Sequence, residues 1–254
     1  MYVKKDHWKR FFLRSINARW SRAESASTSI ANLFLENEIE SGKILDLCCG
    51  NGRLTIWLAK QGYEVVGIDI SPLYLEDAKR KSEEYDVSSR VTFELGDMRD
   101  IDDVAGTERL FDGVINFSTS IGYWDDKTDE MIFRKARRIT RKGGVLIIGE
   151  LDHINHLTHN FKSNMYFEKE DAVILTKATF DTPIFQSTMR YYSKEGNNLK
   201  FIDSLTYQLH MYGVEELSSL LYRSGWKVIG AYGNLETREP VTEDTLMNVV
   251  AKAI

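Results

Sequence analysis

The chain has 254 residues, of which 43% are hydrophobic and 28% charged, and its formal net charge is −5. This length and apolar fraction allow one large domain with a buried core and exclude wholesale disorder. The two cysteines, Cys48 and Cys49, exclude a disulfide framework and a four-thiolate zinc site, and the acidic balance argues against a globally basic nucleic-acid binder.

The first predicted element is a basic amphipathic helix over residues 6–22. Its apolar side chains recur at helical spacing: Trp8, Phe11, Phe12, Ile16 and Trp20. Residues 1–24 hold seven basic side chains against two acidic ones, whereas the remainder holds 26 basic and 36 acidic. No long apolar run occurs here or elsewhere, so we expect no transmembrane helix, no secretory signal and a cytoplasmic protein.

Helices and strands alternate through the next part of the chain. The pattern predicts helices over residues 27–37, 54–60, 72–85 and 126–140, and strands over residues 43–48, 64–70, 91–95, 111–117 and 145–151. A turn is expected at Gly143 and Gly144. Strands that alternate with helices in this way are typical of βαβ units and a parallel sheet.

The alternation ends after Leu151. Residues 164–212 contain several strand-like runs with no helix between them, and residues 195–198 (EGNN) predict a hairpin tip. A helix over residues 213–224 and strands over 226–232 and 246–254 complete the chain. We therefore expect a single domain made of an N-terminal helical lid segment, a core, an inserted antiparallel cap and a C-terminal unit: residues 1–37, 38–151, 152–212 and 213–254.

The segment from Asp46 to Gly52 (DLCCGNG) lies between a predicted strand and a predicted helix, and Asp69 ends the next strand. Glycines in such a turn let a ligand approach the backbone closely. An acidic residue at the end of the second strand can accept both hydroxyls of a ribose. Together these features predict a site for an adenosine-type ligand. The dinucleotide pattern G-x-G-x-x-G is absent, because Thr55 stands at its last glycine position.

The segment resembles the first motif of class I S-adenosylmethionine-dependent methyltransferases, [D/E]-x-G-x-G-x-G, with Cys48 at the first glycine. Later motifs of that family follow in order: GDM at residues 96–98, FDGVINFSTSIGY from residue 111, and RKGG from residue 141. The resemblance implies a Rossmann-like seven-stranded sheet, mostly parallel with an antiparallel last strand, helices on both faces and a late antiparallel cap. It implies S-adenosylmethionine as cofactor, held by Asp46, Cys48, Gly50, Asn51, Gly52, Asp69, Ile70, Asp97, Met98, Asn116 and Phe117.

The segment from Tyr212 to Trp226 is similar to the region before the last helix in small-molecule N-methyltransferases of the amino-sugar and glycine type. This resemblance implies a small-molecule acceptor, with nitrogen slightly preferred over oxygen. It implies no nucleic-acid or membrane partner, and a homodimer is possible. Two alternatives remain: an RNA or protein methyltransferase that uses the basic N-terminal helix, and a non-catalytic protein that binds S-adenosylmethionine.

The acceptor side is predicted less directly. His153, His156 and His159 follow the fifth strand, where a histidine could act as general base, although a solvated polar loop is the simpler interpretation. No metal is expected. We name His153, His156 and Tyr123 as catalytic candidates. The substrate-binding candidates are Tyr123, Trp124, His153, Arg190 and Tyr207.

The basic N-terminal helix is a candidate lid over the cofactor. In that interpretation Arg10, Arg14 or Arg19 meets an acidic group, such as the carboxylate of the cofactor or an anionic substrate. The alternative is a helix that is only docked on the acidic body.

Overall fold

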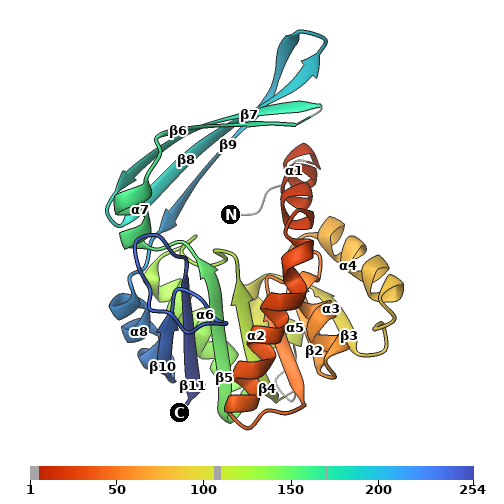
Figure 1. The fold of residues 1–254 in the computed structure, drawn as a ribbon, viewed down its shortest axis with the longest axis vertical. Coiled ribbons are helices and arrows are strands. Elements are labelled where there is room, and N and C mark those ends of the chain that lie inside the picture. The colour runs from red at the N-terminus through yellow and green to blue at the C-terminus, as the bar shows by residue number, and fades with distance from the viewer. Residues whose placement is uncertain (1–5, 106–109, 170) are drawn as a thin grey trace.

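The computed structural model describes residues 6–105, 110–169 and 171–254. Eleven strands form two sheets in this described part (Figure 1). The strands are β1 (Lys43–Leu47), β2 (Glu64–Asp69), β3 (Val91–Leu95), β4 (Phe111–Phe117), β5 (Thr140–Leu151), β6 (Asn164–Glu168), β7 (Ala172–Asp181), β8 (Ile184–Glu195), β9 (Asn198–His210), β10 (Trp226–Tyr232) and β11 (Met247–Ala253).

The seven-stranded sheet has the order β10-β11-β5-β4-β1-β2-β3. β1 to β5 pair in parallel, and β11 is antiparallel to both of its neighbours. The parallel part brings the carboxyl ends of β1, β2, β4 and β5 to one edge, since Leu47 pairs with Ile68 and with Asn116. The predicted fold class, including the antiparallel last strand, is confirmed.

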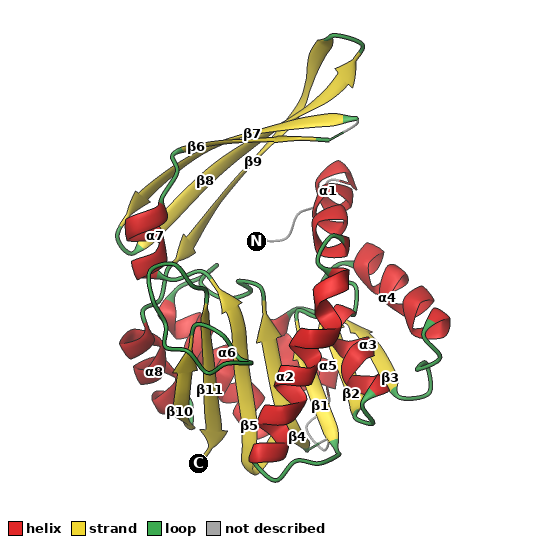
Figure 2. Ribbon diagram, viewed as in Figure 1, coloured by secondary structure: helices red, strands yellow, loops and turns green. Residues whose placement is uncertain are grey.

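Helices cover both faces of this sheet (Figure 2). The longer helices are α1 (Asp6–Asn17), α2 (Ala23–Glu36), α3 (Arg53–Lys60), α4 (Pro72–Glu84), α6 (Asp126–Arg138) and α8 (Val214–Arg223), and the short ones are η1 (Trp20–Arg22), η2 (Met98–Asp100), α5 (Ile101–Ala105) and α7 (Ile154–Asn160). One buried cluster joins α2, α3 and α4 to the sheet, around Phe34 and Ile56. A second joins α6 and α8 to the other face, around Phe133 and Trp226. The apolar stripes of these helices therefore account for the two cores.

The second sheet, β6-β7-β8-β9, is antiparallel throughout and lies beyond the carboxyl edge of the first (Figure 1). The hairpin tip falls between Glu195 and Asn198, as predicted. We call this second sheet the cap sheet. It occupies the part of the chain that the sequence assigns to an antiparallel insertion.

Two local predictions are wrong. The helix predicted over residues 6–22 is divided into α1 and η1, because the chain turns after Asn17. The turn predicted at Gly143 and Gly144 lies inside β5, where the register with β4 shifts and Gly143 has a φ of +79°. A glycine at positive φ absorbs this irregularity without ending the strand.

Candidate functional site

The glycine-containing loop joins β1 to α3 at the carboxyl edge. Cys48, Gly50 and Gly52 have φ values of +60°, +58° and +73°. Cys48 thus adopts the left-handed conformation that favours glycine, at the position where the resembled motif has its first glycine. A Cβ on Gly52 would lie 3.0 Å from Phe93, so this position needs glycine for space as well as for conformation. The loop presents its backbone closely to whatever lies above it.

Asp69 ends β2 beside this loop and is 8% exposed. Its two carboxylate oxygens accept backbone hydrogen bonds from Gly50 at 2.9 Å and Ser71 at 2.8 Å. Burial raises the pKa of Asp69 to about 6, although these backbone donors act in the opposite direction. The carboxylate is therefore fixed in place, and its remaining lone pairs can accept hydroxyl donors.

Asp46 lies on β1, directly before the glycine-containing loop. It is buried and accepts a 2.6 Å hydrogen bond from Thr55 of α3, and burial raises its pKa to about 7. Asn116 donates to the carbonyl of Leu47 at 3.0 Å, while its buried Oδ1 has no hydrogen-bond partner among the described residues. Asp46 and Asn116 thus brace the start of the loop, and Asn116 keeps one acceptor unused.

The loop after β3 carries Asp97 and Met98. Met98 is buried, with its sulfur 3.2 Å from the sulfur of Cys48. Asp97 is paired with Arg99, which holds the pKa of that carboxyl below its usual range and stacks its guanidinium 4.9 Å from the ring of Trp124. Ile70 is 40% exposed at the end of β2. The structure thus places the two predicted adenine-binding residues side by side, and the carboxylate of Asp97 also forms an ion pair with Arg99.

These residues fit an S-adenosylmethionine molecule. The adenine would lie at Met98 and Ile70, an apolar wall at the end of the β2 and β3 strands. The ribose hydroxyls would be accepted by Asp69, which already holds the loop backbone. Phe117, buried at the end of β4, lies further along the same edge toward β5. The set of side chains suits a nucleoside, with one acidic group for the ribose and apolar side chains for the base.

Aromatic side chains gather on the acceptor side. The rings of Tyr123 and Tyr207 lie 6.5 Å apart, and Trp124 lies 6.2 Å from Tyr123. Burial raises the pKa of Tyr123 and of Tyr207, and the charge of Asp152 adds to both shifts. Asp152 directly follows β5, and its carboxylate accepts from Thr119 at 3.3 Å. Asp152 is not among the candidates predicted from the sequence, although its place directly after β5 marks it as a candidate site residue.

The histidines contact the loop between β10 and β11. His153 is 1% exposed with Nε2 2.9 Å from the carbonyl of Thr245, and Nδ1 of His156 lies 2.8 Å from the carbonyl of Glu243. Burial lowers the pKa of His153. His159 contacts the carbonyl of Asn155 in its own helix. These contacts join α7 to the β10–β11 loop, and a catalytic role for His153 or His156 stays a prediction.

Arg190 lies on the other face of the cap sheet from Tyr207. Tyr207 pairs with Ser187, three residues before Arg190 on β8, and successive strand residues face opposite sides. Arg190 instead lines an outer hollow of about 350 Å³ with Tyr166 and Leu175. Arg190 and Tyr207 thus face opposite sides of the cap sheet, and a substrate-binding role for either residue stays a prediction.

The helix α1 connects the cap sheet to the glycine loop. Trp8 is 1% exposed against Ile174 and Met189, and its indole donates to Asp203 at 3.1 Å. Arg14 pairs with Asp171 at 2.7 Å, so its acidic group belongs to the cap, not to a ligand.

The other end of α1 lies against the loop. Oδ1 of Asn17 accepts from Asn51 at 2.8 Å and from Lys81. Ile16 covers Gly50, since a Cβ there would come within 3.6 Å of its side chain. The helix therefore lies over the cofactor loop, in the position that a lid requires.

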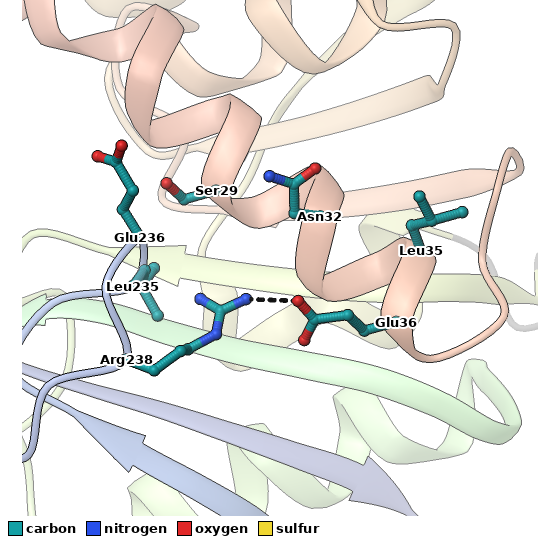
Figure 3. A pocket seen from close by; sticks show the side chains of 7 residues that line it. All are labelled: Ser29, Asn32, Leu35, Glu36, Leu235, Glu236 and Arg238. Atoms are coloured by element: carbon teal, nitrogen blue, oxygen red, sulfur yellow. Dashed lines mark hydrogen bonds and ion pairs between the residues drawn. The ribbon is translucent and has the colours of Figure 1, made fainter.

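Two other features lie outside this edge. A hollow of about 260 Å³ separates α2 from the β10–β11 loop, where Arg238 pairs with Glu36 at 3.0 Å (Figure 3). Asp126, His210 and Glu216 are the one group among the described residues with donor atoms close enough to hold a metal ion. His210 has its two nitrogens at 3.7 Å from Asp126 and 2.8 Å from Glu216, so ion pairing within the group accounts for it. None of the described helices is long and apolar enough to cross a membrane.

Comparison with known proteins agrees with this geometry. Residues 44–144 match the family model described as a methyltransferase domain. The putative methyltransferase YqeM of Bacillus subtilis is 26% identical over 205 residues, covering 79% of this chain and 80% of that protein. Erythromycin 3''-O-methyltransferase of Saccharopolyspora erythraea is 30% identical over 132 residues, which cover 50% of this chain and 41% of that protein.

Solved structures share the fold over its whole length. An S-adenosylmethionine-dependent methyltransferase from Clostridium acetobutylicum has a TM-score of 0.78 at 17% identity, covering 98% of this chain and 99% of that chain. CalS10 of Micromonospora echinaspora, an amino pentose methyltransferase solved with S-adenosylmethionine, has a TM-score of 0.69 at 17% identity and covers 100% and 99%. Residues 44–144 therefore match a methyltransferase domain, and the chain has the class I fold of S-adenosylmethionine-dependent methyltransferases.

Proposed function

We propose that this enzyme methylates an amine of a small molecule. The observation that carries the proposal is the pair of half-buried phenols of Tyr123 and Tyr207, whose rings lie 6.5 Å apart and which both experience the negative charge of Asp152. An anionic group among aromatic faces is suited to a cationic ammonium, which it attracts by charge and by cation–π contact. A neutral hydroxyl gains little from such a site.

Each group of residues has a separate role in the proposed reaction. When bound, S-adenosylmethionine supplies an electrophilic methyl group on a sulfonium. Asp69 and the glycine loop would hold and orient the nucleoside. Asp152 holds the acceptor nitrogen and takes its proton, or passes it to solvent, so that a free lone pair faces the donor. The aromatic walls exclude water, and alignment of donor and acceptor supplies most of the acceleration.

The basic helix α1 bears on the macromolecular alternative. Its apolar face is used by the cap sheet, through Trp8, and Arg14 is paired with Asp171. An RNA or an acidic protein would therefore find less of this helix available than the sequence suggests, and this supports a small acceptor. The similarity to CalS10, an amino pentose methyltransferase, points to the same class of substrate.

The test is a methyl-transfer screen with labelled S-adenosylmethionine. Amino sugars and amino acids are compared with the corresponding hydroxyl compounds and with bulk RNA. We expect turnover of an amine, and a fall of kcat/KM of about 10- to 100-fold in Asp152→Asn, as for loss of one charged hydrogen bond. Asp181→Asn, an exposed carboxylate on β7, is the matched control. Transfer to hydroxyl compounds alone would refute the amine proposal, transfer to RNA alone would support the alternative, and binding without any transfer would identify a non-catalytic protein.

A further inference from the structure

The buried guanidinium of Arg53 lies beside the glycine-containing loop. Arg53 is the first residue of α3, directly after Gly52, and its side chain is 6% exposed. Its Nη2 donates to Ser118 at 2.8 Å and to Glu150 at 2.6 Å. Ser118 in turn donates to the same Glu150 oxygen at 2.7 Å. This network connects the glycine loop to the ends of β4 and β5.

The network is incomplete in one respect. Nη1 of Arg53 is buried and has no hydrogen-bond partner among the described residues. A buried donor on a charged group is costly to leave unpaired, so an acceptor is expected at this point. Glu150 is less enclosed, with 29% of its side chain exposed, and its Oε1 makes no hydrogen bond to the described part of the chain. The pair thus offers one unused cationic donor and one unused anionic acceptor.

The backbone around this pair is held in an unusual conformation. Ser118, Thr119 and Glu150 have φ values of +65°, +53° and +52°, which residues with a Cβ rarely adopt. The amide of Glu150 is fixed by Asn248 at 3.0 Å, and the amide of Ser118 by the carbonyl of Gly149 at 3.0 Å. Such strain persists where the surroundings specify it, and it is concentrated at ligand clamps and active sites.

The order of strands indicates which part of the cofactor reaches the pair. Met98 follows β3 and Asp69 ends β2, so the nucleoside lies over that half of the edge. The other arm must extend past β1 toward β4 and β5, where Ser118 and Glu150 lie. That arm is an amino acid with one carboxylate and one ammonium group, the chemical complement of an unused guanidinium donor and an unused carboxylate acceptor.

We propose that Arg53 and Glu150 form a clamp for the zwitterionic end of S-adenosylmethionine. Arg53 donates through Nη1 to the carboxylate, Glu150 accepts from the ammonium, and Ser118 fixes both side chains. The clamp selects the complete cofactor over nucleosides that lack the amino-acid arm. Arg53 and Glu150 are specificity-determining residues of the cofactor site and take no part in proton transfer.

The test measures binding by calorimetry with two ligands, S-adenosylhomocysteine and 5′-methylthioadenosine, which lacks the amino-acid arm. In Arg53→Gln we expect the Kd of S-adenosylhomocysteine to rise about 10- to 100-fold, as for loss of a charged hydrogen bond. The Kd of 5′-methylthioadenosine should change less than about threefold. Decarboxylated S-adenosylmethionine should also be insensitive to Arg53→Gln but should bind more weakly to Glu150→Gln. Arg134→Gln, which alters an exposed arginine paired with Glu130, is the control.

The folded state of each variant is checked by circular dichroism and thermal melting. Because Arg53→Gln leaves the half-buried carboxylate of Glu150 without its cationic partner, the double variant Arg53→Gln/Glu150→Gln provides a neutral network of similar shape. It should lose the preference for S-adenosylhomocysteine while still binding 5′-methylthioadenosine. Equal weakening of both ligands in folded variants would assign the pair a purely structural role and overturn the proposal. So would a wild-type protein that binds the two ligands equally.

Discussion

The carboxylate of Asp69 provides the sharpest test of the cofactor site. Asp69→Asn keeps the size of the side chain but removes its charge and one of its two acceptor atoms. In the structure these atoms receive the amides of Gly50 and Ser71 at 2.9 and 2.8 Å. The amide nitrogen of asparagine would face one of these N–H groups, donor against donor. It would also remove an acceptor for one ribose hydroxyl.

The expected loss follows from these contacts. A hydrogen bond to a charged group contributes about 1.5–3 kcal/mol. Because the ribose loses one charged acceptor and the loop backbone is displaced, we expect binding of S-adenosylhomocysteine to weaken by about 3 kcal/mol, or roughly 100-fold in Kd. The ligand-free protein should lose about 1–3 kcal/mol through the orphaned backbone amide. A chain of this size then melts about 2–4 °C lower for each kcal/mol lost.

Calorimetry gives the Kd, and the ligand-induced rise in Tm gives an independent estimate of it. The control is Asp86→Asn, an exposed site with a φ of +56° that asparagine tolerates. A folded Asp69→Asn protein that binds S-adenosylhomocysteine within threefold of wild type would refute the assignment of Asp69 to the ribose.

The remaining predictions concern pH and the helix α1. Hydroxyl donors prefer an ionised acceptor, and burial raises the pKa of Asp69 to about 6. Affinity for S-adenosylhomocysteine should therefore be constant above pH 6 and fall about tenfold per pH unit below it. A flat calorimetric profile between pH 5 and 8 would contradict this. The folded pKa of Asp46, about 7, exceeds its ordinary 3.8, so the native state binds the extra proton and Tm of the ligand-free protein should fall as pH rises between these values. Asp46→Asn should reduce this slope, most clearly between pH 6 and 7, because Asp69 contributes to it at lower pH. Trp8→Ala should cost about 3–5 kcal/mol of helix docking, because the indole is fully buried on the cap sheet, and should show as faster proteolysis of α1. Deletion of residues 1–22 should weaken S-adenosylhomocysteine binding if α1 acts as a lid; unchanged affinity in a folded truncation would leave α1 only a docking role.

Much of the fold was predictable because its signals are local. Apolar β-branched runs such as residues 64–69 specify buried strands, and the order of motifs from Asp46 to Gly144 identifies the cofactor core. The position of Asp69 at the end of β2 was predictable from the apolar pattern of the strand, and its role at the ribose stays a prediction. The loss of alternation after Leu151 likewise predicted the antiparallel cap sheet.

The errors arose where an outcome depends on distant partners. The helix over residues 6–22 was divided because Asn17 contacts the loop and α4, and periodicity does not register such contacts. The sequence names Arg190 and Tyr207 as candidates without their register, and strand pairing places them on opposite faces of the cap sheet. Gly143 and Gly144 suggest a turn by composition, yet pairing with β4 keeps them within β5.

The sequence by itself determined the class of fold and indicated the cofactor, and it predicted a carboxylate for the ribose, because each signal lies within a strand and the turn that follows it. Only the tertiary structure decided what surrounds them. Arg53 meets Glu150 across 97 positions, and Trp8 meets Asp203 across 195. The physical reason is that parallel strands bring their carboxyl ends to one edge whatever their separation in the chain, so side chains at that edge become neighbours through sheet order and register.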